Sequence, residues 1–443
     1  MNEKILGGIF GLCVADAIGV PVEFNSRETL ARNPVNDMYG YGTYNQPPGT
    51  WSDDTSMTLC LMDSLTSGLD YSDIMRKFQS WVDKGEYTPH GEVFDIGIAT
   101  RKALQRFTDG TEPLMCGGTS EYDNGNGSLM RILPLAFYLS AMKIKNDEFF
   151  DIIHDVSALT HAHKRSQIAC GIYLSVAMEM LGGRRNIDSG ITAAKRYCNG
   201  YYGDKPEYEE ELEHFERIFS NGFEDLPPED IKSSGYVVHT LEAALWCLLN
   251  TDSYESCVLK AVNLGDDTDT VAAVAGGLAG ILYGIHSIPD RWLEQIARFD
   301  YIKELCGAFH FSLYKPLYKS AARKLCAYIP YLENIDPERA CKFATKPPDA
   351  ISTPIGYDYE EELLDFIEAL SKSKVLHDPL YIKTPIGEFD NELIQTENLE
   401  FLKTMISWYL RAERFCDGVW AGAVKSGAFL AILRRLEALV LYR

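Results

Sequence analysis

The chain has 443 residues, of which 46% are hydrophobic and 24% are charged, and its formal net charge is -22. These proportions are typical of a globular protein, and the length allows more than one domain. So strong a negative charge argues against a protein that holds nucleic acid through its phosphates, but it does not exclude a small anionic ligand.

The 11 cysteines are scattered and include no C-x-x-C pair. Most of them lie in apolar helical surroundings, which favours reduced core thiols in a cytoplasmic protein. Gly, Asp or charged residues interrupt the apolar runs, so we expect none of them to reach the length of a membrane span. The first apolar stretch contains Asp16 and lacks a basic leader, which is not typical of a signal peptide.

Residues 5–20 predict a helix whose glycines allow close approach to its neighbours. Asp16 is an acid inside this apolar helix, and a buried carboxylate needs a partner or a cation. The helix ends before Glu23, which we place in a loop. Residues 25–50 are rich in Pro, Gly, Asn and Tyr, and they predict an irregular loop.

A first acidic stretch follows, in which Ser52, Asp53 and Asp54 stand at the start of an apolar run. Asp and Ser are frequent caps of helix N-termini, so this stretch predicts a helix start. We expect helices over 54–66, 72–84 and 94–107. Asp95 would lie in the first turn of the third helix, where capping alone would explain it.

Residues 116–131 are rich in glycine and asparagine and precede the apolar stretch 129–139. Such a loop can turn its backbone N–H groups toward an anion at a helix start, although Gly-Asn runs more often form simple turns. Residues 149–181 predict two helices joined at Thr160-His161-Ala-His163. Because two histidines at i, i+2 do not share a helix face, a zinc pair is not expected there.

Residues 204–230 are acidic and predict an exposed helix and a linker, followed by helices over 236–250 and 254–262. A second acidic stretch then places Asp266, Asp267 and Asp269 directly before the small and apolar run 271–282. That run predicts a helix buried on most sides. A helix cap needs one or two such residues, so the surplus of carboxylates suggests a cation.

The two acidic stretches predict a metal site if their helix starts face each other. Four carboxylates in a partly buried site would repel one another strongly, and two divalent cations would cancel their charges. An all-oxygen ligand set suits Mg²⁺ or Mn²⁺ better than zinc or copper. The candidate ligands are Ser52, Asp53, Asp54, Asp267, Asp269 and Thr270.

Residues before 300 show almost no period-2 alternation, so we predict an all-α fold for the body of the chain. After about residue 305, aromatic residues and Lys increase, and Pro becomes frequent from 330 to 354. We therefore expect one domain over 1–304 and a smaller, mainly helical domain over 305–443. In the second domain we predict a helix over 359–371, a short hairpin over 378–390 and helices over 397–414 and 417–441.

Six segments in order resemble the ADP-ribosylglycohydrolases, the family that includes dinitrogenase reductase-activating glycohydrolase and the animal ADP-ribosylhydrolases. They span residues 1 to about 300, and the agreement in order makes the match specific. The segments are residues 11–24, Trp51-Ser-Asp-Asp-Thr-Ser-Met57, Phe94-Asp-Ile-Gly97, Gly125-Asn-Gly-Ser-Leu-Met-Arg131, Thr160-His161 and Gly265-Asp-Asp-Thr-Asp-Thr270.

The resemblance implies a compact all-helical enzyme with two divalent cations, Mg²⁺ or Mn²⁺, which cleaves the bond between the distal ribose of ADP-ribose and an acceptor. It assigns the cations to the six candidate ligands above, with Asp269 bridging them. It implies that Glu23 and Asp95 act beside the metals. It implies an ADP-ribose site lined by Gly125, Asn126, Gly127, Ser128 and His161.

Three positions depart from the family pattern. Ser52 replaces the usual Thr and keeps the hydroxyl, Ala15 replaces a Gly, and Asp266 replaces a Gly and adds charge that could change metal preference. The expected partner is an ADP-ribosylated protein or, alternatively, a small ADP-ribose conjugate, and a non-catalytic ADP-ribose-binding module is a third hypothesis. The acceptor stays open, including a nucleic acid, and no role is predicted for residues 305–443.

Overall fold

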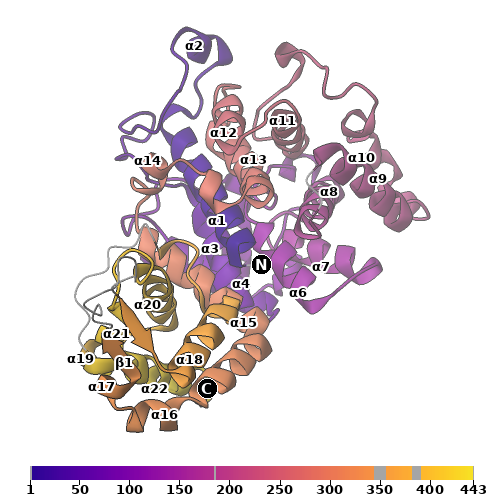
Figure 1. Cartoon of the computed structure of the whole chain (residues 1–443). Helices are drawn as coiled ribbons and strands as arrows, with labels where there is room; N and C mark the ends of the chain where they lie inside the picture. The colour runs from indigo at the N-terminus through magenta and orange to yellow at the C-terminus, as the bar shows by residue number, and fades with distance from the viewer. Residues whose placement is uncertain (1, 184–185, 344–355, 382–390, 443) are drawn as a thin grey trace. The chain divides into compact units, whose positions relative to one another are not determined.

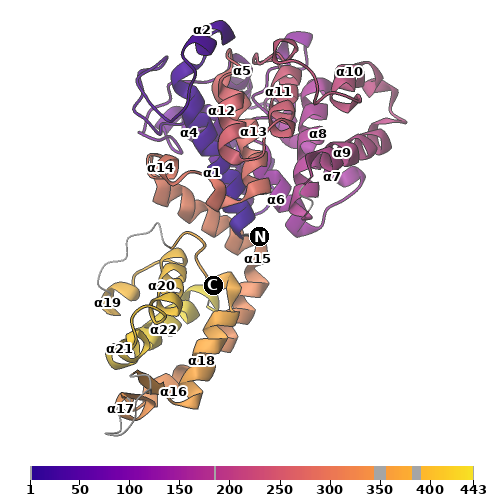
Figure 2. The same ribbon diagram turned by 45° about the horizontal axis from the view of Figure 1, so that its top comes forward.

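The computed structural model describes residues 2–183, 186–343, 356–381 and 391–442 of the chain (Figure 1). The structure is 67% helical with 2% strand, which confirms the all-α prediction. It divides into two compact units, Glu3–Leu313 and Tyr314–Arg443, and Figure 2 shows the same ribbon from a second side.

The first unit is built from helices joined by loops and short 3₁₀ turns. Its α-helices are α1 Asn2–Gly19, α2 Arg27–Arg32, α3 Asp53–Leu65, α4 Tyr71–Lys84, α5 Ile98–Thr108, α6 Leu133–Met142, α7 Asp147–Ala158, α8 Lys164–Leu181, α9 Ile187–Tyr202, α10 Glu209–Glu213, α11 Val237–Leu249, α12 Tyr254–Val262, α13 Thr268–Tyr283, α14 Asp290–Leu293 and the first part of α15 Phe299–Cys326. These bounds agree closely with most of the predicted helices.

Helices α1 and α13 cross in contact at the centre of this unit (Figures 1 and 2). Both are buried along almost their whole length. A Cβ on Gly7 would lie 2.3 Å from the carbonyl oxygen of Gly280, and a Cβ on Gly276 would lie 2.4 Å from that of Gly11. Glycine is therefore required on both helices, as the sequence predicted for the first. The crossing brings the C-terminal end of α1 to the N-terminal end of α13.

The expectation that no apolar run reaches the length of a membrane span was wrong. Residues Asn2–Val22 are long and apolar enough by length and composition, with a mean hydropathy of 2.0. The glycines and Asp16 lower the mean hydropathy of this segment too little to exclude it as a membrane span by length and composition. This apolar window is wholly buried within the structure, so it forms the core helix of the unit.

The prediction of a helix from residue 94 was also wrong at its start. Helix α5 begins at Ile98 with Gly97 as N-cap and no side-chain cap hydrogen bond. Residues 92–97 are irregular, so Asp95 is not a first-turn acid and caps nothing. The predicted exposed helix in 204–230 is reduced to α10 and three 3₁₀ turns, because its acidic residues and prolines do not sustain a longer helix.

The second unit begins within α15, where the backbone leaves the helical region at Tyr314. Pro316 follows two residues later, and proline removes a helical hydrogen bond and crowds the preceding turn. Its further elements are α16 Ile329–Asn334, α17 Pro337–Ala340, β1 Cys341–Phe343, β2 Tyr357–Tyr359, α18 Glu361–Lys372, α19 Asn391–Ile394, α20 Leu399–Ala412, α21 Val419–Ser426 and α22 Ala428–Val440.

The elements of the second unit differ from the predicted ones in two places. The single helix predicted over 417–441 is two helices, because Gly427 adopts φ 76° and ends α21. The strands β1 and β2 pair antiparallel and were not predicted, since three residues each are too short for a period-2 signal. Most of the hairpin predicted over 378–390 lies outside the described residues.

Candidate active site

The two acidic helix starts meet in the structure. The Thr270 hydroxyl at the start of α13 donates a hydrogen bond of 3.3 Å to Asp54 Oδ1 at the start of α3. One carboxylate oxygen from each of Asp16, Asp54 and Asp269 lies within 4.8 Å of the others. Glu23, Asp267 and Asp269 form a second such group. Asp269 belongs to both groups, so α13 supplies the centre of the site.

Asp16 holds the start of α3 in place. Its carboxylate is fully buried and accepts hydrogen bonds from the Ser52 backbone N–H at 3.0 Å and from the Thr55 backbone N–H at 3.1 Å. The Thr55 hydroxyl donates a further bond of 2.6 Å. Ser52 caps α3 by accepting a hydrogen bond from the Asp54 N–H. The buried Asp16 carboxylate was expected to need a partner. That partner is the N-terminus of α3, which donates hydrogen bonds to it.

A strained turn places Glu23 beside the start of α13. Phe24 and Asp266 adopt φ 66° and 59°, a region that disfavours side chains. The Phe24 N–H donates to the Asp266 carbonyl at 2.7 Å, and the Asp266 N–H donates to the Asn25 carbonyl at 2.8 Å. The positive φ explains why glycine is usual at position 266. The Asp266 side chain is exposed.

Burial and mutual repulsion dominate the electrostatics of this site. Burial, followed by the charges of neighbouring carboxylates, raises the pKa of Asp53, Asp54 and Asp269 well above the ordinary range. Burial and the charge of Asp95 raise the pKa of Glu23 to about 8. Carboxylates that repel one another in a buried site are stable when cations join them.

Two buried carboxylate oxygens at the site, Glu23 Oε2 and Asp54 Oδ2, have no hydrogen-bond partner in the described structure. Buried polar atoms are satisfied in most proteins, so an unsatisfied pair at one site indicates a missing ligand. The surrounding donors are carboxylate and hydroxyl oxygens, which suit a hard divalent cation. The residues present therefore fit a divalent metal.

The glycine loop joins this site through Asn126. Its side-chain amide donates hydrogen bonds of 2.8 Å to Asp267 Oδ2 and 2.9 Å to the Thr240 hydroxyl. A Cβ on Gly127 would lie 2.8 Å from His161 Cε1, so only glycine lets the loop lie on the imidazole ring. Helix α6 begins at Leu133, after the end of this loop.

His161 and Ser128 are fixed beneath this loop. Burial and the charge of Arg131 lower the pKa of His161 to about 3, so the ring is neutral. His161 Nδ1 lies 2.8 Å from the Thr160 hydroxyl, which accepts a hydrogen bond from Arg131. Ser128 is buried and accepts a hydrogen bond from the Ser157 hydroxyl. The structure thus brings Glu23, Asp54, Asp267, Asp269 and Thr270 together, and it places Asn126 of the glycine loop beside Asp267.

Comparison with known proteins decides what this arrangement belongs to. The family model described as ADP-ribosylglycohydrolase matches residues 1–320, which is most of the chain. The chain belongs to the ADP-ribosylglycohydrolase family. It is therefore a hydrolase, and the resemblance found in the sequence is confirmed. Residues 317–441 match a second model, described as a family of unknown function, DUF6508.

Several ADP-ribosylglycohydrolase relatives cover the same region. The chain is 34% identical over 305 residues to an ADP-ribosylarginine hydrolase of Serratia proteamaculans (68% of this chain, 78% of the relative). It is 30% identical over 300 residues to the ADP-ribosyl-[dinitrogen reductase] glycohydrolase of Rhodospirillum rubrum (67% and 91%). A solved ADP-ribosylglycohydrolase-related protein complex superposes with a TM-score of 0.58 and 31% identity (70% and 98%).

Tyr44 is a residue of the glycohydrolase site that the sequence did not reveal. Its hydroxyl lies close to the carboxylates of Glu23 and Asp95 and lowers the pKa of each, against the larger effect of burial. Asp95 thus lies opposite Glu23 although it is far away in the chain. No spacing or cap marks Tyr44, because it lies in the irregular loop before α3. Only its aromatic neighbours in that loop give a signal.

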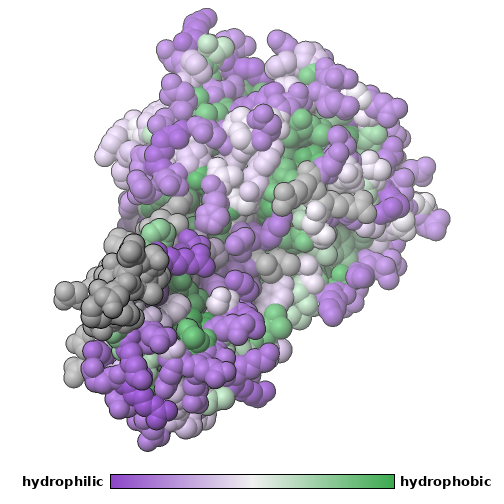
Figure 3. Space-filling view, in the orientation of Figure 1, coloured by the Kyte–Doolittle hydropathy of each residue, from purple (hydrophilic) through white to green (hydrophobic). Residues whose placement is uncertain are grey.

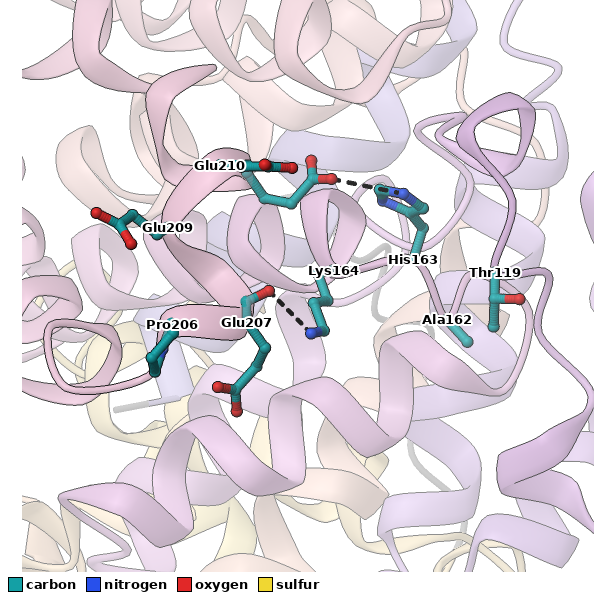
Figure 4. A pocket seen from close by; sticks show the side chains of 9 residues that line it. Thr119, Ala162, His163, Lys164, Pro206, Glu207, Glu209 and Glu210 are labelled. Atoms are coloured by element: carbon teal, nitrogen blue, oxygen red, sulfur yellow. Dashed lines mark hydrogen bonds and ion pairs between the residues drawn. The ribbon is translucent and has the colours of Figure 1, made fainter.

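A hollow of about 500 Å³ lies beside the start of α8 (Figure 4). Lys164 donates to the Glu207 carbonyl at 2.8 Å across it. Four glutamates make the wall of this hollow negative, so the hollow is unsuited to a diphosphate. The backbone N–H groups of the glycine loop would suit a diphosphate better. The hollow is lined by Thr119, Ala162, His163, Lys164, Pro206, Glu207, Glu209, Glu210 and Glu211.

A second acidic cluster borders this hollow and is closed by an arginine. Arg165 donates to Glu121 Oε1 and to Glu211 Oε2, both at 2.7 Å. His163 Nε2 lies 3.6 Å from Glu211 and 3.8 Å from Glu121. These three residues could also surround a metal by distance alone. The guanidinium of Arg165 already pairs with both carboxylates, and water solvates the exposed Glu121, so this cluster needs no added cation.

Proposed function

We propose that the chain uses two divalent cations, Mg²⁺ or Mn²⁺, to hydrolyse the glycosidic bond between the distal ribose of ADP-ribose and a protein side chain, and so reverses protein ADP-ribosylation. The observation that carries the proposal is the unpartnered pair of buried oxygens, Glu23 Oε2 and Asp54 Oδ2, within a cluster of carboxylates. Its family membership supports the choice of substrate.

The cations would be held by the two helix starts. Bound there, they would polarise the ribose hydroxyls and lower the pKa of a water molecule. Ser52 and Thr270 add hydroxyl oxygens to the carboxylates, and Asp16 keeps the first of these helix starts in position. The proposed ligands are Ser52, Asp53, Asp54, Asp267, Asp269 and Thr270, with Asp269 shared between the ions.

The remaining residues would position the substrate and accept the proton. Glycine at position 127 lets the loop pack on the neutral ring of His161, and the backbone N–H groups of this loop would bind the diphosphate. Glu23 or Asp95 would accept the proton of the attacking water. The Tyr44 hydroxyl, which lies close to both carboxylates, would donate its hydrogen bond to one of them.

The acceptor that we propose is arginine. The relatives at 34% and 30% identity are named for ADP-ribosylarginine and for ADP-ribosylated dinitrogen reductase. In this reaction the water oxygen bonds to the anomeric carbon, the carbon–nitrogen bond breaks, and the guanidine nitrogen takes up a proton.

All 11 cysteines are free thiols, which supports a location in the reducing cytoplasm.

The test is release of ADP-ribose from arginine-linked and serine-linked ADP-ribosyl peptides, with Mg²⁺, with Mn²⁺ and with EDTA. We expect release from the arginine-linked peptide that stops on chelation and returns when metal is restored. Metal-independent release would remove the cations from the proposal. Tight ADP-ribose binding without release from any conjugate would instead support a binding module.

A further inference from the structure

Three aromatic rings form a row along the edge of the site. The ring centroids of Phe24 and Tyr44 are 6.4 Å apart, and those of Tyr44 and Phe94 are 5.0 Å apart. Each end of the row adjoins a candidate catalytic acid in the chain, because Phe24 follows Glu23 and Phe94 precedes Asp95. The row therefore connects the two chain segments that carry the candidate acids.

Phe24 is held outward at a cost to the fold. Its side chain is 70% exposed, so core packing does not explain a large aromatic residue there. Its φ of 66° is strained for a bulky residue. The backbone bond to Asp266 at 2.7 Å fixes this conformation. Strain that fixes an exposed side chain beside a catalytic acid indicates a binding role.

Tyr44 is tied to the same turn. The Thr43 N–H donates to the Pro21 carbonyl at 2.9 Å, and the Thr43 hydroxyl donates to the Glu23 carbonyl at 2.8 Å. A Cβ on Gly42 would lie 1.8 Å from the Pro21 oxygen, so the loop lies directly on the turn. The rings of Phe24 and Tyr44 are thus positioned by backbone contacts and do not depend on a ligand.

The chemistry of this row matches a planar cation. Aromatic faces carry negative electrostatic potential, and guanidinium stacks on them while donating to carboxylates. Glu23 and Asp95, which both lie close to Tyr44, supply the carboxylates. A neutral serine or threonine acceptor has no positive charge to place against the rings. A wall of this kind therefore discriminates between classes of acceptor.

We propose that Phe24, Tyr44 and Phe94 form the wall that binds the arginine side of the substrate and sets the acceptor specificity of the enzyme. This inference rests on the proposed function, because it concerns the acceptor half of the same substrate. ADP-ribose itself lies on the other side of the reacting bond, so its affinity does not depend on the wall.

The test compares Phe24→Leu, which keeps bulk and removes the π face, with Phe24→Trp, which keeps it. For an arginine-linked peptide, we expect KM to rise about 3- to 30-fold in Phe24→Leu, the range of a cation–π contact, and to recover in Phe24→Trp. The affinity of free ADP-ribose, measured by calorimetry, should be the same in all variants. Phe415→Leu is the matched control, because Phe415 is 89% exposed in the other unit.

An unchanged KM in Phe24→Leu, or an equal loss of ADP-ribose affinity, would overturn the inference while leaving the hydrolase intact. If the wild-type protein releases no ADP-ribose, the proposed function fails, and binding then decides the inference. In that case the wall predicts that the arginine-linked peptide binds more tightly than ADP-ribose and that Phe24→Leu abolishes the difference. Equal affinities would refute it.

Discussion

The first unit contains two acidic clusters that differ in what neutralises them. In the deep cluster at the starts of α3 and α13, the charges acting on Asp54 and Asp269 are those of other carboxylates. In the peripheral cluster beside α8 and α10, Glu121 and Glu211 flank the guanidinium of Arg165 at 2.7 Å. Both clusters satisfy the distance criterion for a metal, so distance alone does not identify a metal site.

The carboxyl pKa values shift in opposite directions in the two clusters. Burial and repulsion raise the pKa of Asp54 well above its ordinary value, whereas hydrogen bonding to Arg165 lowers the pKa of Glu121. A cluster whose carboxylates resist ionisation has to bind protons or a cation from outside the chain. The peripheral cluster already contains a cation, the guanidinium of Arg165. The predictions below test whether this contrast governs activity and stability.

The largest effect is expected for Asp269→Asn, which removes the carboxylate common to both metal groups. Loss of residues that merely orient metal ligands typically costs about 10- to 100-fold, so we expect turnover to fall by more than about 100-fold. Asn has nearly the same shape, and circular dichroism should show an unchanged helical fold. The measurement is kcat for ADP-ribose release from the arginine-linked peptide.

The neighbouring Asp266→Asn is the matched control for this variant. Asp266 is exposed, and asparagine tolerates its positive φ. We expect turnover close to that of the wild-type protein. Normal turnover in Asp269→Asn would remove the metal centre from the mechanism, and equal losses in both variants would show that the effect belongs to the turn rather than to the carboxylate.

Metal binding should also reverse which protein is more stable, the wild type or the variant Asp54→Asn. A cation present at about 100 times its Kd stabilises a protein by about 2.7 kcal/mol, so the wild-type Tm should rise when Mg²⁺ replaces EDTA. In EDTA, Asp54→Asn should be the more stable protein, because it removes one repelling carboxylate. In Mg²⁺, the wild type should be more stable. Thermal unfolding of both proteins under both conditions measures this.

Asp63→Asn provides a control on the same helix. Asp63 forms an ion pair with Lys77 at 2.5 Å, so its removal should lower Tm slightly and equally in Mg²⁺ and EDTA. A wild-type Tm that does not respond to metal would contradict the assignment of the deep cluster as a metal centre.

The sequence was sufficient to predict the deep cluster because its signals are local. Asp and Ser before an apolar run mark a helix start, and the glycines of α1 predict the close crossing that brings Asp16 near α13. Tyr44 and the position of Asp95 could not be predicted in this way. They depend on contacts between the loop before α3, the turn at Glu23 and an irregular segment, none of which has a periodic pattern.

The peripheral cluster shows the same limit of sequence reasoning. Residues 204–230 were interpreted as a solvated acidic segment, yet Glu211 is paired with Arg165 from the start of α8. Acidic segments are usually solvated, so composition alone favours that interpretation. The pairing becomes visible only when α8 and α10 are placed side by side. Similarly, the positive φ of Gly427 divides a segment whose apolar periodicity continues through it.

Arg165→Gln should destabilise the protein without changing metal binding. Arg165 is 5% exposed, while its partners differ, with side-chain exposures of 17% for Glu211 and 62% for Glu121. Breaking a buried pair costs about 3–5 kcal/mol and an exposed pair at most about 1 kcal/mol. We therefore expect a loss of about 2 kcal/mol in urea unfolding. The Mg²⁺-dependent rise in Tm should remain, and its loss would show that the clusters are coupled.

The smallest effect is expected for Glu121→Gln. Glu121 is 62% exposed, so water already solvates its carboxylate and its pair with Arg165 contributes little to stability. Arg165 keeps Glu211 at 2.7 Å, so the buried guanidinium is not left alone. The measurement is urea unfolding at low and high salt, where screening should shrink the small difference from the wild type. A loss of stability as large as that of Arg165→Gln, insensitive to salt, would mean that Arg165 needs both carboxylates as partners. The peripheral cluster would then be a tightly coupled buried network. It would differ from the deep cluster only in the source of its cation, which is an arginine of the chain, and the stability of the fold would depend on it just as strongly.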